Sequence, residues 1–66
     1  MKVVCFINDA LKSYQEVPHD FLIRIYEGDN QLASEWIENF KSNASEYLDR
    51  EIMTIEAYTE EVYVYI

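Results

Sequence analysis

The alternation of apolar and polar positions is clearest in residues 21–26 (FLIRIY). Ile23 and Ile25 fall on one face of this segment, and Arg24 and Tyr26 fall on the other. A period of two residues is typical of a β-strand that buries one face. We therefore predict a strand over these residues, with its aliphatic face toward the core.

Residues 2–7 (KVVCFI) are apolar at both alternating sets of positions. A short continuous apolar run is typical of an interior strand covered on both faces, so we predict a strand here, antiparallel to the one described above. Asn8 and Asp9 supply the turn chemistry that ends it. For residues 13–17 the pattern leaves a strand extension and a loop as open alternatives, and Pro18 argues against a central strand.

In the second half of the chain the apolar period changes to three and four residues. The positions that fall on one helical stripe are Leu32, Ala33, Trp36, Ile37, Phe40, Ala44, Tyr47 and Leu48. We predict one helix over residues 31–48 that packs across a sheet, with Asp29 or Asn30 as its N-cap. Trp36 and Phe40 are the predicted anchors of the core, because a large aromatic side chain on an apolar stripe is usually buried.

The closing stretch IEAYTEEVYVYI, residues 55–66, has the pattern of a β-hairpin. A two-residue loop at Thr59 and Glu60 would create one apolar face and one face of tyrosine, threonine and glutamate. On the apolar face Ala57, Ile55 and Met53 would oppose Val62, Val64 and Ile66, and on the other Tyr58, Glu56 and Thr54 would oppose Glu61, Tyr63 and Tyr65. A four-residue loop over residues 59–62 preserves the same parity, so both loop lengths stay open.

Together these elements predict a single α+β domain over residues 1–66, in the order strand, strand, helix, strand, strand (ββαββ). The sheet would be four-stranded and mostly antiparallel, with one helix packed on its apolar face. A chain of 66 residues buries only about 60% of the surface that its unfolded form exposes, which leaves little room for a deep pocket. The open face of the sheet would carry Glu56, Tyr58, Tyr63, Tyr65, Arg24 and Tyr26, together with Val4 and Phe6.

Charge narrows the range of partners. Thirteen Asp and Glu residues stand against five Lys and Arg residues, a formal net charge of −8. Such a protein is repelled by nucleic acid and by anionic membranes, and it is attracted to basic proteins. We therefore expect no direct binding to nucleic acid and no membrane association. The acidity also serves solubility, because half of the residues are hydrophobic.

No residue pattern points to catalysis, to a cofactor or to a metal. His19 has no second histidine, and Cys5 is the only cysteine, which excludes an intrachain disulfide or a multi-cysteine metal site. We expect Cys5 to be buried as a small hydrophobic residue. An apolar amino-terminal run of five residues is too short for a signal peptide, so a cytoplasmic setting is expected.

Two acidic surfaces remain as candidates for binding a partner. One is the exterior of the predicted helix, with Glu35 and Glu38. The other is the tyrosine-bearing side of the carboxyl-terminal hairpin, with Glu56, Tyr58, Glu60, Glu61, Tyr63 and Tyr65. Tyrosine is enriched at protein interfaces because it combines a large contact area with a hydrogen-bonding tip, although it also suits exposed strand positions.

These features favour a protein-binding inhibitor whose carboxylates occupy a basic, nucleic-acid-binding surface on a larger protein. The general profile is similar to that of proteins of bacteriophages and mobile elements that block restriction, CRISPR effectors or uracil-DNA glycosylase, although no stretch carries a motif of a named family. The alternative is a structural or assembly module. It would form a homodimer through the tyrosine face, or pair edge to edge through residues 61–66.

Overall fold

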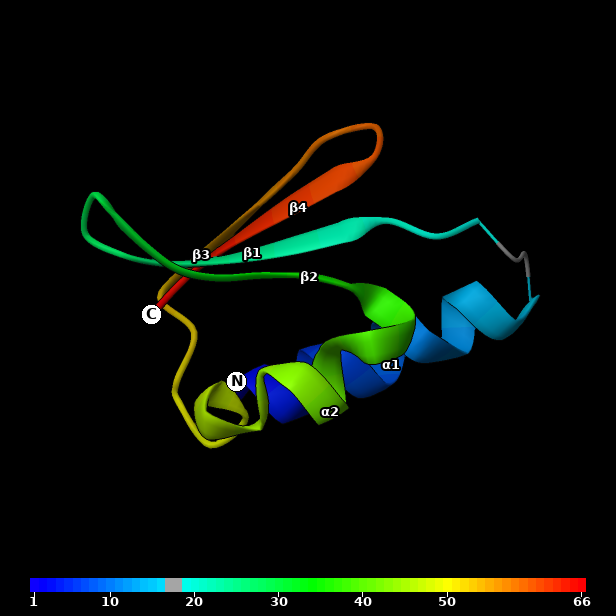
Figure 1. The fold of residues 1–66 in the computed structure, drawn as a ribbon, viewed down its shortest axis with the longest axis horizontal. Helices are drawn as coiled ribbons and strands as arrows, with labels where there is room; N and C mark the ends of the chain where they lie inside the picture. The colour runs from blue at the N-terminus through cyan, green and yellow to red at the C-terminus, as the bar shows by residue number, and fades with distance from the viewer. Residues whose placement is uncertain (17–18) are drawn as a thin grey trace.

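The computed structural model describes residues 1–16 and 19–66, which form two layers, a β-sheet and a set of helices under one of its faces (Figure 1). The elements in chain order are helix α1 (Val3–Glu16), strands β1 (Leu22–Glu27) and β2 (Asn30–Trp36), the short helices η1 (Ile37–Asn39), α2 (Phe40–Asn43) and η2 (Ser45–Tyr47), and strands β3 (Thr54–Ala57) and β4 (Glu61–Tyr65). The class is α+β, as predicted. Within the described residues no helix combines the length and the apolar character needed to cross a bilayer.

The four strands form a mixed sheet in the order β2-β1-β4-β3. Two antiparallel hairpins, β1–β2 and β3–β4, are joined where β1 and β4 pair in parallel. Parallel neighbours require a crossover connection, and the helical segment after β2 supplies it. The predicted order ββαββ and the mostly antiparallel sheet are therefore wrong in detail, because a helix begins the chain and the central pair of strands is parallel.

The amino-terminal segment is helical, which corrects the predicted strand at residues 2–7. Val3, Ile7 and Ala10 of α1 are buried, and their spacing of four and three residues is the period of a helix. A window of five apolar residues was too short to reveal this period. Lys2 retains only an isolated antiparallel bridge with Glu51.

Helix α1 also decides two other predictions for this region, the burial of Cys5 and the conformation of residues 13–16. Cys5 is exposed rather than buried, because it falls on the side of the helix that faces away from the core. Residues 13–16 continue α1, so they form neither a strand nor a loop. Val17 and Pro18, on which the rest of that prediction depended, lie outside the described residues.

The β1–β2 hairpin replaces the first part of the predicted helix at residues 31–48. Glu27 pairs with Asn30, so the loop consists of Gly28 and Asp29, and Gly28 has a φ of 60°. A positive φ at the first loop position is a feature of hairpin turns that match strand twist, and it favours glycine. Asp29 and Asn30 therefore belong to a turn and a strand rather than to an N-cap.

The remainder of the predicted helix survives as short helical turns between Ile37 and Tyr47. Phe40 is fully buried, which confirms it as a core residue. Trp36 is 49% exposed, so its predicted place in the core is wrong. Trp36 is the last residue of β2 and pairs with Leu22, which directs its side chain away from the helices.

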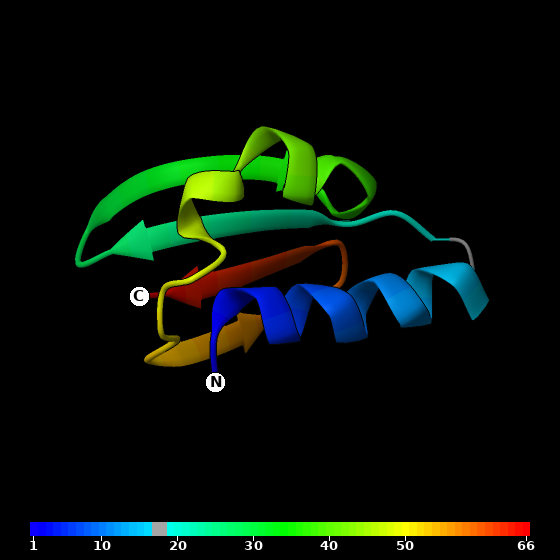
Figure 2. The same cartoon turned by 90° about the horizontal axis from the view of Figure 1, so that it is seen from below.

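The core lies between the helices and one face of the sheet. Its buried members are Val3, Ile7, Ala10, Ile23, Ile25, Ile37, Phe40, Ala44, Val64 and Ile66. Figure 2 shows α1 running along the β3–β4 half of the sheet and the short helices along the β2 half. Burial of Ile23 and Ile25 confirms the predicted inward face of β1.

The carboxyl-terminal hairpin has the register predicted for a two-residue loop. Ile55 pairs with Val64, and Glu56 pairs with Tyr63, while the amide of Tyr58 donates to the carbonyl of Glu61 at 2.7 Å. Thr59 and Glu60 thus form the loop, and the four-residue alternative is excluded. The apolar and tyrosine faces separate as predicted because parity in a hairpin follows directly from loop length.

Candidate protein-binding face

The side of the sheet opposite the helices carries a group of polar and aromatic side chains that we call the tyrosine face. Strand pairing places them in adjacent rows across all four strands. Its members are Leu22, Arg24, Tyr26, Gln31, Ser34, Trp36, Thr54, Glu56, Tyr58, Glu61, Tyr63 and Tyr65. The face is assembled from residues far apart in the sequence, because the parallel pairing of β1 with β4 brings the two hairpins together.

Four tyrosine rings form the centre of the tyrosine face. The ring centroid of Tyr26 lies 5.4 Å from that of Tyr63 and 5.5 Å from that of Tyr65, both in stacked orientation. Tyr58 meets Tyr63 edge-on, with centroids 5.1 Å apart. These separations fall in the favourable range for aromatic pairs. The rings therefore hold one another in place before any partner arrives.

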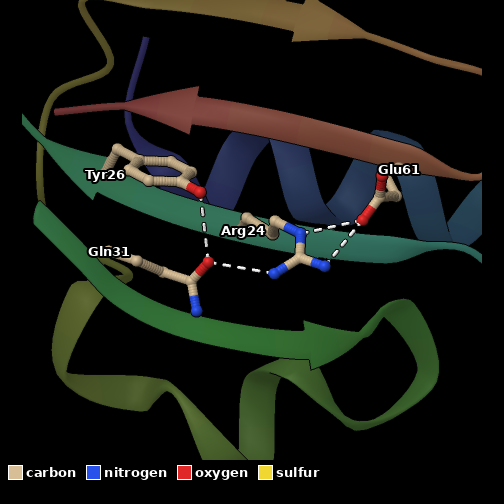
Figure 3. A network of polar contacts seen from close by, with 4 residues as sticks. All are labelled: Arg24, Tyr26, Gln31 and Glu61. Carbon is tan, nitrogen blue, oxygen red and sulfur yellow. Dashed lines mark hydrogen bonds and ion pairs between the residues drawn. The ribbon is translucent and has the colours of Figure 1, made fainter. Parts of the chain in front are cut away.

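A polar network spans three strands beside these rings (Figure 3). Arg24 Nε donates to Glu61 Oε1 at 2.8 Å, and Arg24 Nη2 lies 2.7 Å from the same oxygen. Gln31 Oε1 accepts hydrogen bonds from Arg24 Nη1 at 3.0 Å and from the hydroxyl of Tyr26 at 3.1 Å. The guanidinium carbon of Arg24 also lies 6.0 Å from the ring centroid of Tyr63. Each polar group is thus oriented by a neighbour on another strand.

Hydrogen bonds to carboxylates set the ionisation of the face. The hydroxyl of Tyr65 donates to Glu56 Oε1 at 2.7 Å, and this hydrogen bond raises the pKa of Tyr65 to about 12. The hydrogen bond with Glu61 raises the pKa of Arg24 in the same way. Near neutral pH the face therefore presents the neutral phenol of Tyr65 and the charged guanidinium of Arg24.

The carboxylates of the face outnumber its cations. Arg24 is matched by Glu61, while Glu56 adds a second carboxylate and Glu60 lies exposed in the adjoining loop. Lys12 and Lys41 belong to α1 and α2, in the other layer. The face is consequently aromatic at its centre and net negative along its β3–β4 half.

Trp36 is a member of this face that the sequence pattern missed. A signal was present: Gly28 and Asp29 separate two segments by two residues, and Gly-Asp is a recognised hairpin loop. Pairing residues 22–27 with 30–36 through that loop places Trp36 beside Leu22 and on the same side as Arg24. The helical stripe was the stronger local pattern, so it concealed the hairpin.

Glu35 and Glu38 do not join the tyrosine face. Glu35 pairs with Ile23, which is buried on the helix side, and it accepts a hydrogen bond from Asn43 Nδ2 at 2.9 Å. Glu38 lies in η1 and accepts a hydrogen bond from the hydroxyl of Tyr14 at 2.9 Å, which raises the pKa of Tyr14. The predicted acidic stripe on a helix exterior is therefore absent, because residues 31–36 are a strand.

The other predicted site residues come together. Glu56, Tyr58, Glu60, Glu61, Tyr63 and Tyr65 all belong to the β3–β4 hairpin and its loop. Arg24 and Tyr26 join them, as expected. Val4 and Phe6 were expected on the same side and are instead part of α1, in the helical layer.

Possible metal ligands and His19 are the chemical groups to consider outside the tyrosine face. Within residues 1–16 and 19–66, no three His, Cys, Asp or Glu side chains converge in a way that could hold a metal ion. His19 is exposed and lines an open hollow of about 360 Å³ with Ser13, Tyr14, Glu16 and Phe21.

No protein-family model matches this chain, no curated protein matches its sequence and no solved structure matches its fold. Function is therefore inferred from the chemistry of the tyrosine face.

Proposed function

We propose that this protein is an inhibitor that docks its tyrosine face on a basic, nucleic-acid-binding surface of a larger protein. The observation that carries the proposal is the row of four tyrosine rings, each packed against at least one other, on an open sheet face with carboxylates beside them, in a chain of net charge −8. Rigid aromatic side chains offer contact area at low entropic cost, and the carboxylates steer a basic surface toward them.

The arrangement suits arginine and lysine side chains on the partner. A guanidinium within about 6 Å of an aromatic centroid is attracted by the ring, and the Arg24–Tyr63 pair already has that geometry within the protein. Glu56 and Glu60 can accept charge-assisted hydrogen bonds from the same cations. A surface evolved to hold phosphates and bases would thus find negative charge and aromatic rings here.

A nucleic acid is a poorer occupant of this face. Proteins that stack single-stranded bases on aromatic side chains also track the phosphates with a positively charged groove. On the described part of the tyrosine face the cation is Arg24, and Glu61 neutralises it. The surrounding carboxylates would repel phosphates, so the face favours a protein that itself binds nucleic acid.

A second candidate function is an assembly module, and one observation favours it. Strand β3 is an edge of the sheet and exposes Ile55, with Met53 just before it. Exposed strand edges can pair with another copy of the same chain. Two chains of net charge −8 would repel each other at low salt, which makes the inhibitor the better-supported proposal.

The test is a pull-down with tagged protein from a lysate of the cells that produce it, washed at low and at high salt. We expect recovery of a basic nucleic-acid enzyme that is released as salt rises, because screening weakens charge-directed contacts. Adding the enzyme's nucleic acid should displace it from the bait. If nucleic acid and the bait bind together without competition, the proposed docking site on the enzyme is wrong.

Light scattering on the purified protein separates the assembly module from the inhibitor. The inhibitor is expected to be a monomer at low salt. A dimer that persists at high salt, with no basic protein recovered, would instead support the assembly module.

A further inference from the structure

The two edges of the sheet are protected to different degrees. Edge strand β2 carries an irregularity opposite Ile25 and Tyr26, where Leu32 is left without a partner, and such a bulge disfavours pairing with another strand. Edge strand β3 (TIEA) has neither bulge nor proline nor lysine. All four of its residues are exposed, so β3 is the open edge.

The pairing of β3 with β4 determines which backbone groups point outward. The amide of Tyr58 donates a hydrogen bond to the carbonyl of Glu61, toward β4. Glu56 and Thr54 come two and four residues before Tyr58, so their backbone N–H and C=O groups also point toward β4. In an antiparallel pair the residues between them direct their N–H and C=O groups to the other side. Ile55 and Ala57 therefore present two amides and two carbonyls to the outer edge.

Side chains next to this edge are also uncovered. Met53 is 81% exposed. Ile55 is 37% exposed, even though its side chain lies on the helix side of the sheet. On the opposite face Glu56 is exposed as well. The amino terminus lies alongside only the approach to β3, where the amide of Ile52 donates to the carbonyl of Met1 at 2.8 Å. The edge from Thr54 to Ala57 is left open.

We propose that β3 receives an extended segment of the basic partner as a fifth strand. Successive side chains of an added strand point to opposite faces of the sheet. One set would lie beside Ile55 and Ala57 and is therefore apolar, whereas the other would lie beside Glu56 and is therefore lysine or arginine. The segment recognised is thus an alternating apolar and basic peptide. This inference rests on the proposed function, since it names the part of the partner that the protein holds.

Charge distinguishes this occupant from a second copy of the chain. Pairing β3 with another β3 would bring two chains of net charge −8 together, and each edge would carry its own Glu56. A basic segment instead neutralises Glu56 and covers the exposed side chain of Ile55. Complementarity of charge and of apolar surface therefore selects the basic peptide.

The test uses the wild-type protein and a synthetic peptide of about seven residues that alternates lysine and valine. Backbone amide exchange is followed by NMR with the peptide at about ten times its dissociation constant, where mass action slows the exchange of any newly paired amide about tenfold. We expect this slowing at Ile55 and Ala57. A lysine-proline peptide of the same charge, which cannot pair as a strand, should produce none.

Two variants test the same pairing by affinity. Ala57→Pro removes an outward N–H and leaves the ladder to β4 intact, and proline is tolerated at such edge positions. We expect it to weaken lysine-valine peptide binding about tenfold, the effect of losing a hydrogen bond and adding a steric block. Ala57→Val keeps the N–H and should bind as tightly as wild type. A thermal unfolding measurement on each variant serves as the control that it is folded.

The outcomes separate this inference from the proposed function. Unchanged exchange at Ile55 and Ala57, with equal peptide affinity for both variants, would overturn strand addition. Binding of the basic enzyme that remained sensitive to Tyr63→Ala would then leave the proposed function standing. Conversion of a wild-type dimer to a monomer by Ala57→Pro would show that a second copy occupies the edge, which would also overturn the inference.

Discussion

The two faces of the sheet differ in role: the helix face packs the core, and the tyrosine face is the proposed docking surface. On β1, Ile25 is fully buried against the helices, whereas its neighbour Tyr26 stacks on two other tyrosines at the open surface. The helix face gains its free energy from burial of aliphatic and aromatic surface. The side chains of Tyr26, Tyr63 and Tyr65 on the tyrosine face are only partly buried, and this face carries the aromatic and charged groups that a partner could contact. Substitutions on the two faces should therefore affect different properties.

Phe40→Ala should have the largest effect on the helix face. Phe40 is fully buried, and replacing a buried phenylalanine by alanine costs about 3–5 kcal/mol. This loss approaches the whole stability of a chain of 66 residues. Chemical denaturation followed by circular dichroism measures it. A loss below about 1 kcal/mol would show that the core is not centred on Phe40.

Tyr63→Ala should reduce partner affinity strongly and the stability of the fold only moderately, the opposite of what we expect for Phe40→Ala. Tyr63 contacts Tyr26 and Tyr58, and each aromatic pair contributes about 0.5–1.5 kcal/mol, so the fold should lose about 1–3 kcal/mol. Partner affinity should fall about thirtyfold or more, as for a hot spot of about 2 kcal/mol.

The matched control for this substitution is Tyr63→Phe, which keeps the ring and should retain most of the affinity. Calorimetric titration with the recovered partner measures both variants. Equal affinities for Tyr63→Ala and wild type would remove the ring cluster from the binding site.

Alkaline pH should weaken the tyrosine face selectively. The pKa of Tyr65 is raised from 10.0 to about 12 by its hydrogen bond to Glu56. Because the unfolded chain releases this proton first, the stability from the hydrogen bond is fully present below pH 10 and is lost as pH rises to about 12. In unfolding experiments the free energy of unfolding of Tyr65→Phe should fall less between pH 10 and about pH 12 than that of the wild type. Ultraviolet titration should show a lower pKa for Tyr65 in Glu56→Gln, and an unchanged pKa would rule out the hydrogen bond as its cause.

Trp36→Ala should have the smallest effect on folding. The side chain is 49% exposed, and surface substitutions usually change the free energy of unfolding by about 0.5 kcal/mol or less. As the only tryptophan, Trp36 reports on its own environment. Its fluorescence should be readily quenched by acrylamide in the free protein, and the partner should protect it. If acrylamide quenched Trp36 only weakly in the free protein, the side chain would be buried in the core and its exposed position would be wrong.

The carboxyl-terminal hairpin and β1 could be predicted from the sequence because both follow from local rules. Alternation assigns the faces of each strand, and the loop at Thr59 and Glu60 then determines the register. The tyrosine side of the hairpin was accordingly correct before the rest of the fold was known. Arg24 and Tyr26 joined it because they occupy the polar side of β1.

The rest of the fold depended on information that local patterns do not hold. The apolar run at residues 2–7 fits a strand as well as a helix until Ala10 is included. The stripe from residue 32 to 48 fits a helix unless Gly28 and Asp29 are read as a hairpin loop. The parallel pairing of β1 with β4 is a contact between distant segments, and no periodicity in the sequence reports it.

The most direct test of the tyrosine face as the docking surface compares two double charge reversals with the same change in net charge. Glu56→Lys with Glu60→Lys alters the tyrosine face and its loop, whereas Asp9→Lys with Glu46→Lys alters exposed positions in the helical layer. Association rates with the recovered partner are measured at low salt for both variants and for wild type. We expect the first variant to associate about tenfold more slowly than the second, because local charge steers encounter. Equal rates for the two variants would contradict docking through the tyrosine face.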